Sequence, residues 1–379
     1  MKRDEIEADL LDWMRASPWR RDDERFARLA LALFRFQYEA CEPYARFCRS
    51  LGRTPSEVER FEEIPAVPTG AFKEFDLCCF DPKRTIKTFR TSGTSSDRRG
   101  QLHLDTLELY EASLLSSLRE TLVDDLIGTR PTMRFLAPSA EASPDSSLSH
   151  MFEILREAEG GPASEFDLRD ENLDLESLEA SIAHARTDDS PILLLGTSFA
   201  FVHLLDAAES SEGRSRGNPW RLPAGSRVME TGGFKGRSRE VPRDVLRADL
   251  ARRFALPESA VVNQYGMTEL GSQFYDSTWV DPRGPRRKLA PPWTRVRFVD
   301  PATEREVAPG DVGLIVIHDL ANTGSVAALQ TADLGRAVRD DDGESTGFDV
   351  IGRLEGAEER GCSIATDVML EASQGTLRT

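Results

Sequence analysis

The residues best suited to chemistry form a hydroxyl-rich loop, Thr91 to Ser96, within the run Phe89-Arg-Thr-Ser-Gly-Thr-Ser-Ser-Asp-Arg-Arg-Gly100. Five of the six loop residues carry a hydroxyl group, and the sixth is Gly93. Such a loop can direct backbone N–H groups and hydroxyls at a polyphosphate, because glycine allows close approach. Arg98 and Arg99 can supply positive charge. The same composition is also common in ordinary loops, and the run lacks the Gly-Lys-Ser/Thr ending of a P-loop.

Three more segments follow this phosphate loop in a set order: Gln264-Tyr-Gly-Met-Thr-Glu269, Thr331-Ala-Asp333 and Gly352-Arg353. The ordered set resembles the adenylate-forming enzymes, which include acyl-CoA synthetases, adenylation domains and luciferases. Within that superfamily the chain is most similar to LuxE-type acyl-protein synthetases, the ATP-dependent subunits of a bacterial fatty-acid reductase. The resemblance spans roughly residues 60 to 365. It also rests on Ile64-Pro-Ala-Val-Pro-Thr-Gly-Ala-Phe-Lys73, Pro144-Asp-Ser-Ser-Leu-Ser149 and Arg360-Gly-Cys-Ser363.

The resemblance implies that ATP and Mg²⁺ bind, and it assigns roles to the matching positions. Glu269 would be the Mg²⁺ ligand, since this hard cation prefers carboxylate oxygen. Thr268 would touch the α-phosphate, Asp333 would bind the ribose hydroxyls, and Arg353 would contact the ribose or the phosphate. The residues that hold the β- and γ-phosphates would be Thr91, Ser92, Gly93, Thr94, Ser95 and Ser96. The residues near the adenine would be Gly232, Gly233 and Tyr265, and Gly266 and Met267 would also bind the nucleotide.

These parts would activate a carboxylic acid. A carboxylate is a poor electrophile, but its attack on the α-phosphate of ATP makes an acyl-AMP with a good leaving group. That step requires the charge of the triphosphate to be neutralised. Two departures from the family pattern stand out: the phosphate loop lacks the usual second Gly and Lys, and Ala332 replaces the Gly of Thr-Gly-Asp.

The acyl acceptor is expected to be Cys362. Acyl-CoA synthetases continue into a mobile C-terminal domain with a catalytic Lys, whereas this sequence ends at Thr379 and has no Lys after Lys288. LuxE-type proteins are short in the same way and accept the acyl group on a Cys in an Arg-Gly-Cys context. A thiolate is the nucleophile, and Arg360 would lower the thiol pKa. The alternative is that Cys362 is a small buried residue.

Other functions remain open on the sequence alone. The chain could adenylate the acid and pass the acyl group to CoA or to a separate carrier protein. It could also be a non-catalytic adenylate-binding subunit, a reading that the altered phosphate loop favours. The substrate expected from the family is a fatty acid, and an acyl-reductase or acyl-carrier protein is the expected partner.

The composition limits the class of protein. The chain has 379 residues, of which 39% are hydrophobic and 30% charged, so it can bury a sizeable core. Its formal net charge of −17 argues against nucleic-acid binding. No apolar run approaches the ~20 residues of a membrane span, and the charged N-terminus has no signal core. Five scattered cysteines suit a reducing compartment, so we expect a cytoplasmic enzyme.

The elements that must position these residues are expected from their periodicity. Helical spacing predicts helices over residues 4–16 and 22–39, and a capping box predicts a third that begins at Thr54. Apolar strands followed by glycine turns are predicted at Ile192–Leu195, Arg227–Glu230 and Ala260–Gln264. The other predicted strands are Thr85–Phe89, Met133–Ala137, Arg295–Val299, Gly313–His318, Ser325–Leu329 and Phe348–Ile351, and the other predicted helices include Ser146–Glu157, Asn172–Arg186 and Pro242–Phe254.

Alternating strands and helices predict an α/β fold like that of adenylate-forming enzymes. The large N-terminal domain would contain helix-covered β-sheets, followed by a small β-rich C-terminal portion without the full mobile C-terminal domain. The predicted division is a helical cap over residues 1–60, an α/β core that binds ATP and acyl-adenylate over 61–293, and a β-rich subdomain with a short C-terminal segment over 294–379. Ligands of such sheets bind at the carboxyl ends of the strands, where Thr197, Ser198 and Phe199 could line a pocket.

Overall fold

The chain forms two compact units in the computed structural model. The model describes residues 1–91, 98–169, 172–210, 218, 220–232, 241–340, 343 and 345–354. The α/β unit consists of Leu118–Gly266 and Phe274–Arg286, and the β-rich unit of Met1–Ser117, Met267–Gln273 and Arg287–Thr379. The three-part division expected from the sequence stays a prediction. Each unit is described by itself.

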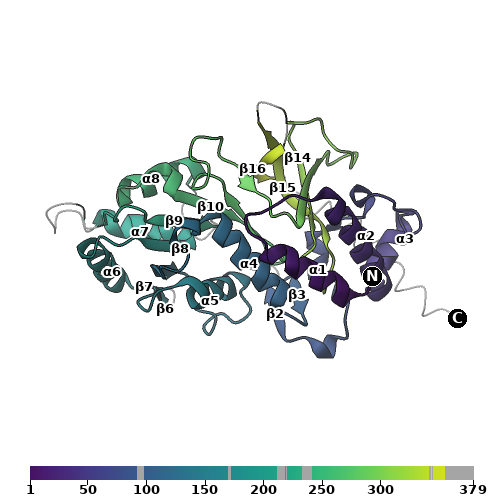
Figure 1. The fold of residues 1–379 in the computed structure, drawn as a ribbon, viewed down its shortest axis with the longest axis horizontal. Helices are drawn as coiled ribbons and strands as arrows, with labels where there is room; N and C mark the ends of the chain where they lie inside the picture. The colour runs from purple at the N-terminus through teal and green to yellow at the C-terminus, as the bar shows by residue number, and fades with distance from the viewer. Residues whose placement is uncertain are drawn as a thin grey trace. The chain divides into compact units, whose positions relative to one another are not determined.

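A parallel sheet forms the centre of the α/β unit (Figure 1), in the order β5-β4-β8-β9-β10-β11. Only β11 runs antiparallel to its neighbour, β10. The strands are β4 Thr132–Leu136, β5 Glu165–Phe166, β8 Ile192–Thr197, β9 Arg227–Thr231, β10 Val261–Tyr265 and β11 Phe274–Asp276. The apolar runs predicted as buried strands are confirmed, because both faces of this sheet are covered.

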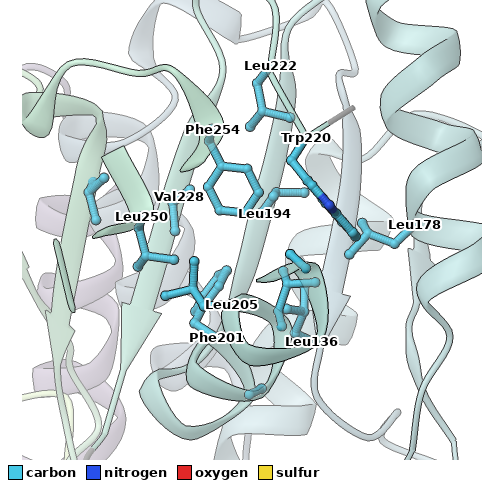
Figure 2. Close-up of a cluster of buried hydrophobic side chains, with 14 of the residues drawn as sticks. Leu136, Leu178, Leu194, Phe201, Leu205, Trp220, Leu222, Val228, Leu250 and Phe254 are labelled. Atoms are coloured by element: carbon cyan, nitrogen blue, oxygen red, sulfur yellow. The ribbon is translucent and has the colours of Figure 1, made fainter. Parts of the chain in front are cut away.

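Helices on both faces of this sheet bury the apolar side chains. The helices of this unit are α5 Ser147–Glu159, α6 Leu175–Thr187, α7 Ser198–Ser210 and α8 Arg243–Phe254, with the short helices η4 Asp124–Leu126 and η5 Glu258–Ala260. On one face, Phe135 of β4 packs against Phe152 of α5 with their ring centroids 5.1 Å apart. On the other, α6, α7 and α8 enclose the core shown in Figure 2, in which Leu194, Phe201, Trp220, Val228, Leu250 and Phe254 are labelled.

One predicted helix of this unit begins too early. Residues 172–186 were expected to be helical throughout, but Asn172–Leu173 is the strand β7, which pairs with β6 Leu168–Arg169. The helix begins only after Asp174, whose side chain accepts from the backbone N–H of Ser177. Asp174, expected inside the helix, therefore caps it instead.

The strands of the β-rich unit pair in the order β13-β14-β15-β16-β12. Its antiparallel strands are β12 Lys288–Leu289, β13 Thr294–Val299, β14 Gly313–Asp319, β15 Ala328–Arg339 and β16 Ser345–Arg353. The strand predicted at Ser325–Leu329 is therefore displaced, since β15 continues through Thr331-Ala-Asp333. The short strand β1 Val67–Pro68 pairs with β15 in parallel.

Helices and a β-hairpin complete the β-rich unit. Its helices are α1 Arg3–Arg15, α2 Asp23–Ala40, α3 Glu42–Ser50 and the start of α4 Glu108–Thr121, with short 3-10 turns η1 Phe61–Glu63, η2 Thr69–Lys73 and η3 Pro82–Arg84. The first two predicted helices are confirmed. The third is wrong. Thr54 N donates to Glu57 Oε2 at 2.8 Å, as in a capping box, and Thr54 Oγ1 donates to the same oxygen at 2.7 Å, but only a turn follows. The hairpin joins β2 Lys87–Arg90 to β3 Gln101–Leu104.

No helix in the described ranges is long and apolar enough to span a bilayer.

Candidate functional site

The carboxyl ends of β8, β9 and β10 carry a buried polar network. The Glu230 carboxylate, at the end of β9, accepts from Asn263 Nδ2 of β10 at 2.6 Å. It also accepts from the hydroxyl of Ser198, the first residue of α7. Three neighbouring strand ends are thereby tied together at the edge where parallel sheets bind ligands.

The glycine of the Tyr-Gly-Met-Thr-Glu motif lies against a side-chain amide that links two strands. Thr231 Oγ1 donates to the side-chain carbonyl of Gln264, which links β9 to β10. A Cβ atom on Gly266 would lie 2.5 Å from Gln264 Nε2. Any larger residue at position 266 would therefore displace the cross-strand amide.

Three of the residues expected to bind the nucleotide lie at the same strand ends: Gly232, Tyr265 and Gly266. Gly232 is exposed and has φ +78°, a left-handed conformation that favours glycine. Tyr265 is half-buried, and its ring lies 6.1 Å from that of Phe274 at an angle of 44°. Gly233 lies outside the described residues. Gly232, Tyr265 and Gly266 therefore follow adjacent strands of the α/β unit.

The base of the phosphate loop is a hairpin neck in the β-rich unit. Thr91 N donates to Gly100 O at 2.9 Å, and Gly100 N donates to Thr91 Oγ1 at 2.9 Å. Arg99 donates to the carbonyls of Thr91 at 2.6 Å and Arg90 at 3.3 Å. Arg98 forms an ion pair with Glu74 at 2.6 Å. Of the predicted phosphate-binding residues only Thr91 is described, since Ser92, Gly93, Thr94, Ser95 and Ser96 lie outside the described ranges.

The segment Met267–Gln273 carries the predicted metal ligand. Thr268 and Met267 are half-buried, and Glu269 is buried, with 7% of its surface exposed. The backbone turns here, because Leu270 N donates to Met267 O at 3.2 Å. The backbone carbonyl of Glu269 accepts from Asn322 Nδ2 at 3.0 Å, so its main chain is held in place from the loop that follows β14.

A fully buried carboxylate, Asp319, holds the other end of the same segment. It accepts from Ser272 Oγ at 2.7 Å, Ser272 N at 2.8 Å and Ala321 N at 3.1 Å. Burial raises the pKa of Asp319 from 3.8 to about 6, although these donors lower it. Trp293 Nε1 donates to Ser272 Oγ at 3.1 Å and to Ser113 Oγ at 3.0 Å, which extends the network towards α4.

The predicted ribose and phosphate ligands Asp333 and Arg353 face each other on neighbouring strands. They are paired positions of β15 and β16, where Asp333 is half-buried and Arg353 exposed. Thr331 Oγ1 donates to Ile315 O at 3.0 Å and accepts from Asp333 N at 3.1 Å. The carboxylate thus projects from a backbone that the threonine fixes, and the Ala at position 332 does not prevent this arrangement.

The segment Ile64–Lys73 adjoins both of these features within the β-rich unit. Val67 and Pro68 pair with Leu329 and Gln330, immediately before Thr331. A Cβ on Gly100, at the loop neck, would lie 3.6 Å from the Cβ of Phe72. The segment therefore connects the phosphate-loop neck with the strand that carries Asp333.

A magnesium ion fits the donor set of this unit. Within the described ranges, no group of three or more His, Cys, Asp or Glu side chains could hold a metal by itself. Mg²⁺, however, is commonly bound by one or two carboxylates together with the phosphates of its substrate. The Glu269 carboxylate, on a backbone fixed by hydrogen bonds, is a donor of that kind.

The candidate acceptor Cys362 lies outside the described residues, as does Arg360. The described cysteines are Cys41, Cys48 and Cys79, which are buried, and Cys78, which is partly exposed. Burial raises the pKa of Cys78, and it raises that of Cys48 to about 12. A thiol that must attack an activated acyl group needs access and thiolate character, and these four residues do not combine them.

Sequence reasoning missed four polar residues that organise these regions: Glu230, Asn263, Asp319 and Asn322. Three of them interrupt or end an apolar strand, as in Arg227-Val-Met-Glu230 or Leu314-Ile-Val-Ile-His-Asp319, whereas Asn322 lies in the loop that follows β14. A charged or amide side chain at a buried strand position usually needs specific partners. That pattern is the signal that could have identified them.

Comparisons with known proteins identify the family of the chain. The family model described as acyl-protein synthetase, LuxE, matches residues 145–372. A long-chain-fatty-acid–luciferin-component ligase of Vibrio harveyi is 23% identical over 344 residues, covering 89% of this chain and 86% of the relative. Its counterpart in Aliivibrio fischeri is 24% identical over 371 residues, covering 94% and 92%.

Solved structures show the same fold. An open conformation of 2-hydroxyisobutyryl-CoA ligase, in complex with 2-HIB-AMP and CoA, aligns with a TM-score of 0.61 at 16% identity. The alignment covers 88% of this chain and 76% of that one. The predicted family resemblance and the predicted α/β fold of adenylate-forming enzymes are both confirmed.

Proposed function

Because the chain belongs to the LuxE acyl-protein synthetase family, and is thus an enzyme of the ligase class, we propose that it activates a carboxylic acid with ATP and transfers the acyl group to Cys362. The observation that carries the proposal is the family match over residues 145–372, which includes both the Tyr-Gly-Met-Thr-Glu segment and Cys362. The two bacterial relatives are named for long-chain fatty acids, so a fatty acid is the proposed substrate.

In the first step, a carboxylate oxygen of the acid attacks the α-phosphorus of ATP, and pyrophosphate leaves. The product is an acyl-AMP, in which the carbonyl carbon has a good leaving group. Negative charge on the transferring phosphate must be offset by groups already in position. Thr91 and the rest of the phosphate loop, together with Thr268, would supply hydroxyl and N–H donors. Bound Mg²⁺, held by Glu269 and the phosphates, would supply Lewis-acid charge.

The remaining contacts would hold the nucleoside. Asp333 would accept hydrogen bonds from the ribose hydroxyls, with Arg353 opposite it contributing positive charge to the ribose or phosphate. The adenine would lie along the backbone of Gly232, Gly233 and Gly266, beside the Tyr265 ring. Support for this placement comes from the left-handed Gly232 and the exclusion of any side chain at Gly266.

In the second step, the Cys362 thiolate attacks the acyl carbonyl of the acyl-AMP. A carbon–sulfur bond forms, the carbon–oxygen bond to AMP breaks, and AMP leaves with the electron pair. Arg360, two residues away, would favour the thiolate. The thioester then makes the acyl group available to a partner, for which an acyl-reductase or an acyl-carrier protein is suited. We propose that these reactions occur in the cytoplasm.

Intact-protein mass spectrometry tests the proposal. Wild type, Cys362→Ser and the control Cys78→Ser are each incubated with Mg²⁺-ATP and a panel of carboxylic acids of increasing chain length. We expect an acyl adduct, labile to hydroxylamine, on wild type and on Cys78→Ser but not on Cys362→Ser. The acid that modifies the largest fraction of the protein identifies the substrate class.

Other outcomes contradict different parts of the proposal. An adduct that persists on Cys362→Ser would assign the acceptor to another residue. Acid-dependent ATP–pyrophosphate exchange without any adduct would indicate transfer to CoA or to a carrier. Tight ATP binding without exchange for any acid would contradict the activation step itself and favour a non-catalytic subunit.

A further inference from the structure

We propose that Asp319 and Asn322 are positioning residues that hold Glu269 in the orientation required for metal binding. The inference rests on the proposed function, because it takes Glu269 as the Mg²⁺ ligand. Asp319 ends β14, and Asn322 lies in the loop that follows it. Neither residue belongs to the motifs from which the family was recognised.

Two anchors hold the Glu269 segment to this loop, one at the ligand itself and one three residues after it. At Glu269 itself, the backbone carbonyl accepts from Asn322 Nδ2 at 3.0 Å. Three residues later, the Ser272 backbone N–H donates to Asp319 Oδ2 at 2.8 Å, and the Ser272 hydroxyl donates to Asp319 Oδ1 at 2.7 Å. Fixing the backbone at Glu269 and three residues after it restricts the direction in which the Glu269 side chain leaves the main chain.

The segment and the loop are also in close backbone contact. A Cβ on Gly271 would lie 3.0 Å from the Ala321 Cβ and 3.1 Å from the Ala321 carbonyl carbon. The same Ala321 donates its N–H to Asp319 Oδ1 at 3.1 Å. One carboxylate therefore accepts from the backbone on both sides of the contact, so a shift of the loop would carry the segment with it.

A long helix holds the loop in turn. Gln37, buried in α2, donates from Nε2 to Asn322 O at 2.8 Å and accepts at Oε1 from Ala327 N at 3.0 Å. Asn322 Nδ2 also donates to Val326 O at 3.0 Å. The loop that positions Glu269 is thus fixed by side-chain amides at several points and does not depend on its own stiffness.

Burying the Asn322 side chain has a free-energy cost, which indicates a role beyond stability. Its side chain is buried, and Oδ1 has no hydrogen-bond partner among the described residues. A buried unsatisfied carbonyl costs roughly 1–3 kcal/mol, which the two Nδ2 hydrogen bonds to Glu269 O and Val326 O must offset. The amide is explained if its Nδ2 bond to the Glu269 carbonyl serves the metal site, because groups that orient a ligand contribute strongly to metal affinity.

The test measures how much metal strengthens nucleotide binding. The affinity for a fluorescent ATP analogue is determined with excess Mg²⁺ and again in EDTA, without acid substrate, and the ratio of the two affinities is compared among variants. The variants are Asp319→Asn, Asn322→Asp and Ser272→Ala. The matched control is Asp167→Asn, which alters a similarly buried carboxylate that accepts from Arg134 in the α/β unit.

We expect Asp319→Asn and Asn322→Asp to reduce this ratio by about 10- to 100-fold, the usual effect of losing a group that orients a metal ligand. Binding in EDTA should stay at the wild-type value. Asp167→Asn should leave the ratio unchanged. Ser272→Ala keeps the backbone N–H bond to Asp319 and loses only the hydroxyl, so it should fold if Asp319→Asn does not, and it should reduce the ratio by a smaller factor.

A wild-type ratio in folded Asp319→Asn and Asn322→Asp would overturn the proposal, as would an equal loss in Asp167→Asn. If Asp319→Asn does not fold, a wild-type ratio in Asn322→Asp and Ser272→Ala would overturn the proposal instead. Glu269→Gln separates the two levels of inference. If Glu269→Gln keeps the wild-type ratio of affinities, the metal role assigned to Glu269 is wrong. If Glu269→Gln reduces the ratio while the positioning variants keep it, only the positioning role is wrong.

Discussion

The two units of the chain present their candidate nucleotide residues in different ways. In the α/β unit these residues offer mainly backbone to the ligand. They are Gly232, with its left-handed conformation, and Gly266, where a Cβ would contact the Gln264 side chain. In the β-rich unit they are charged side chains, Glu269, Asp333 and Arg353, on backbones fixed by buried hydrogen bonds.

This difference shows what a backbone contact and a charged side-chain contact each require. A flat ring can lie against bare backbone, so the strand ends need glycine and the absence of side chains. Charge must be met by side chains already in position, because reorganising them during the reaction would cost free energy. Buried networks supply that rigidity in the β-rich unit, and we therefore expect its variants to lose more activity than those of the α/β unit.

The largest expected effect is that of Glu269→Gln, which removes the charge but keeps the shape. We expect acid-dependent ATP–pyrophosphate exchange to fall by about 10²–10³-fold, as for loss of a group that stabilises transition-state charge. The control is Glu159→Gln, because Glu159 is also 7% exposed and accepts from Arg119 at 2.7 Å in the α/β unit. Exchange rates and thermal melting are measured for both. Equal loss of exchange in the control would remove the distinction between the two units.

Two neighbouring residues of β14 should make stability depend on pH in opposite directions. Burial lowers the pKa of His318 from 6.5 to about 3, so the unfolded state binds more protons between these values and stability rises with pH. Burial raises the pKa of Asp319 from 3.8 to about 6, so the folded state binds more protons there and stability falls as pH rises. In wild type the two trends largely cancel between about pH 4 and 6.

Single substitutions should reveal each trend. As pH rises from about 4 to 6, we expect His318→Phe to become less stable and Asp319→Asn to become more stable. Each change should be on the order of 2 kcal/mol, at ~1.4 kcal/mol per pH unit. Urea unfolding at intervals of pH gives the slopes. Curves parallel to that of wild type would show that these side chains do not titrate as their burial requires.

The smallest expected effect compares two glycines on either side of β9. Gly225 and Gly232 have φ +80° and φ +78°, and neither would meet a close contact on gaining a Cβ. Each change to Ala should therefore cost roughly 1–2 kcal/mol of stability from backbone strain alone. Only Gly232→Ala should also raise the KM for ATP, by several-fold, in the exchange assay. A raised KM in Gly225→Ala would mean that strain, and not the lost backbone surface, weakens binding.

Several parts of the fold could be predicted from local pattern. The apolar run Ile192–Leu195 and the amphipathic spacing of residues 22–39 are strong signals, and both elements formed as expected. The hairpin strand β3 and the helix α3 were not foreseen, since a strand of four residues and a helix of nine give little periodicity. At Thr54 the capping signal was real, but no amphipathic stretch followed to sustain a helix.

The sequence by itself determined the order of motifs, and with it the family, the α/β fold and the residues proposed to meet ATP. Those signals are local, since each depends on residues close together in the chain. Only the tertiary structure decided which buried polar groups meet. Asp319 accepts from Ser272, 47 residues earlier, and Gln37 donates to Asn322, 285 residues later. Such pairs depend on strand register and on the packing of distant segments, which no local spacing specifies.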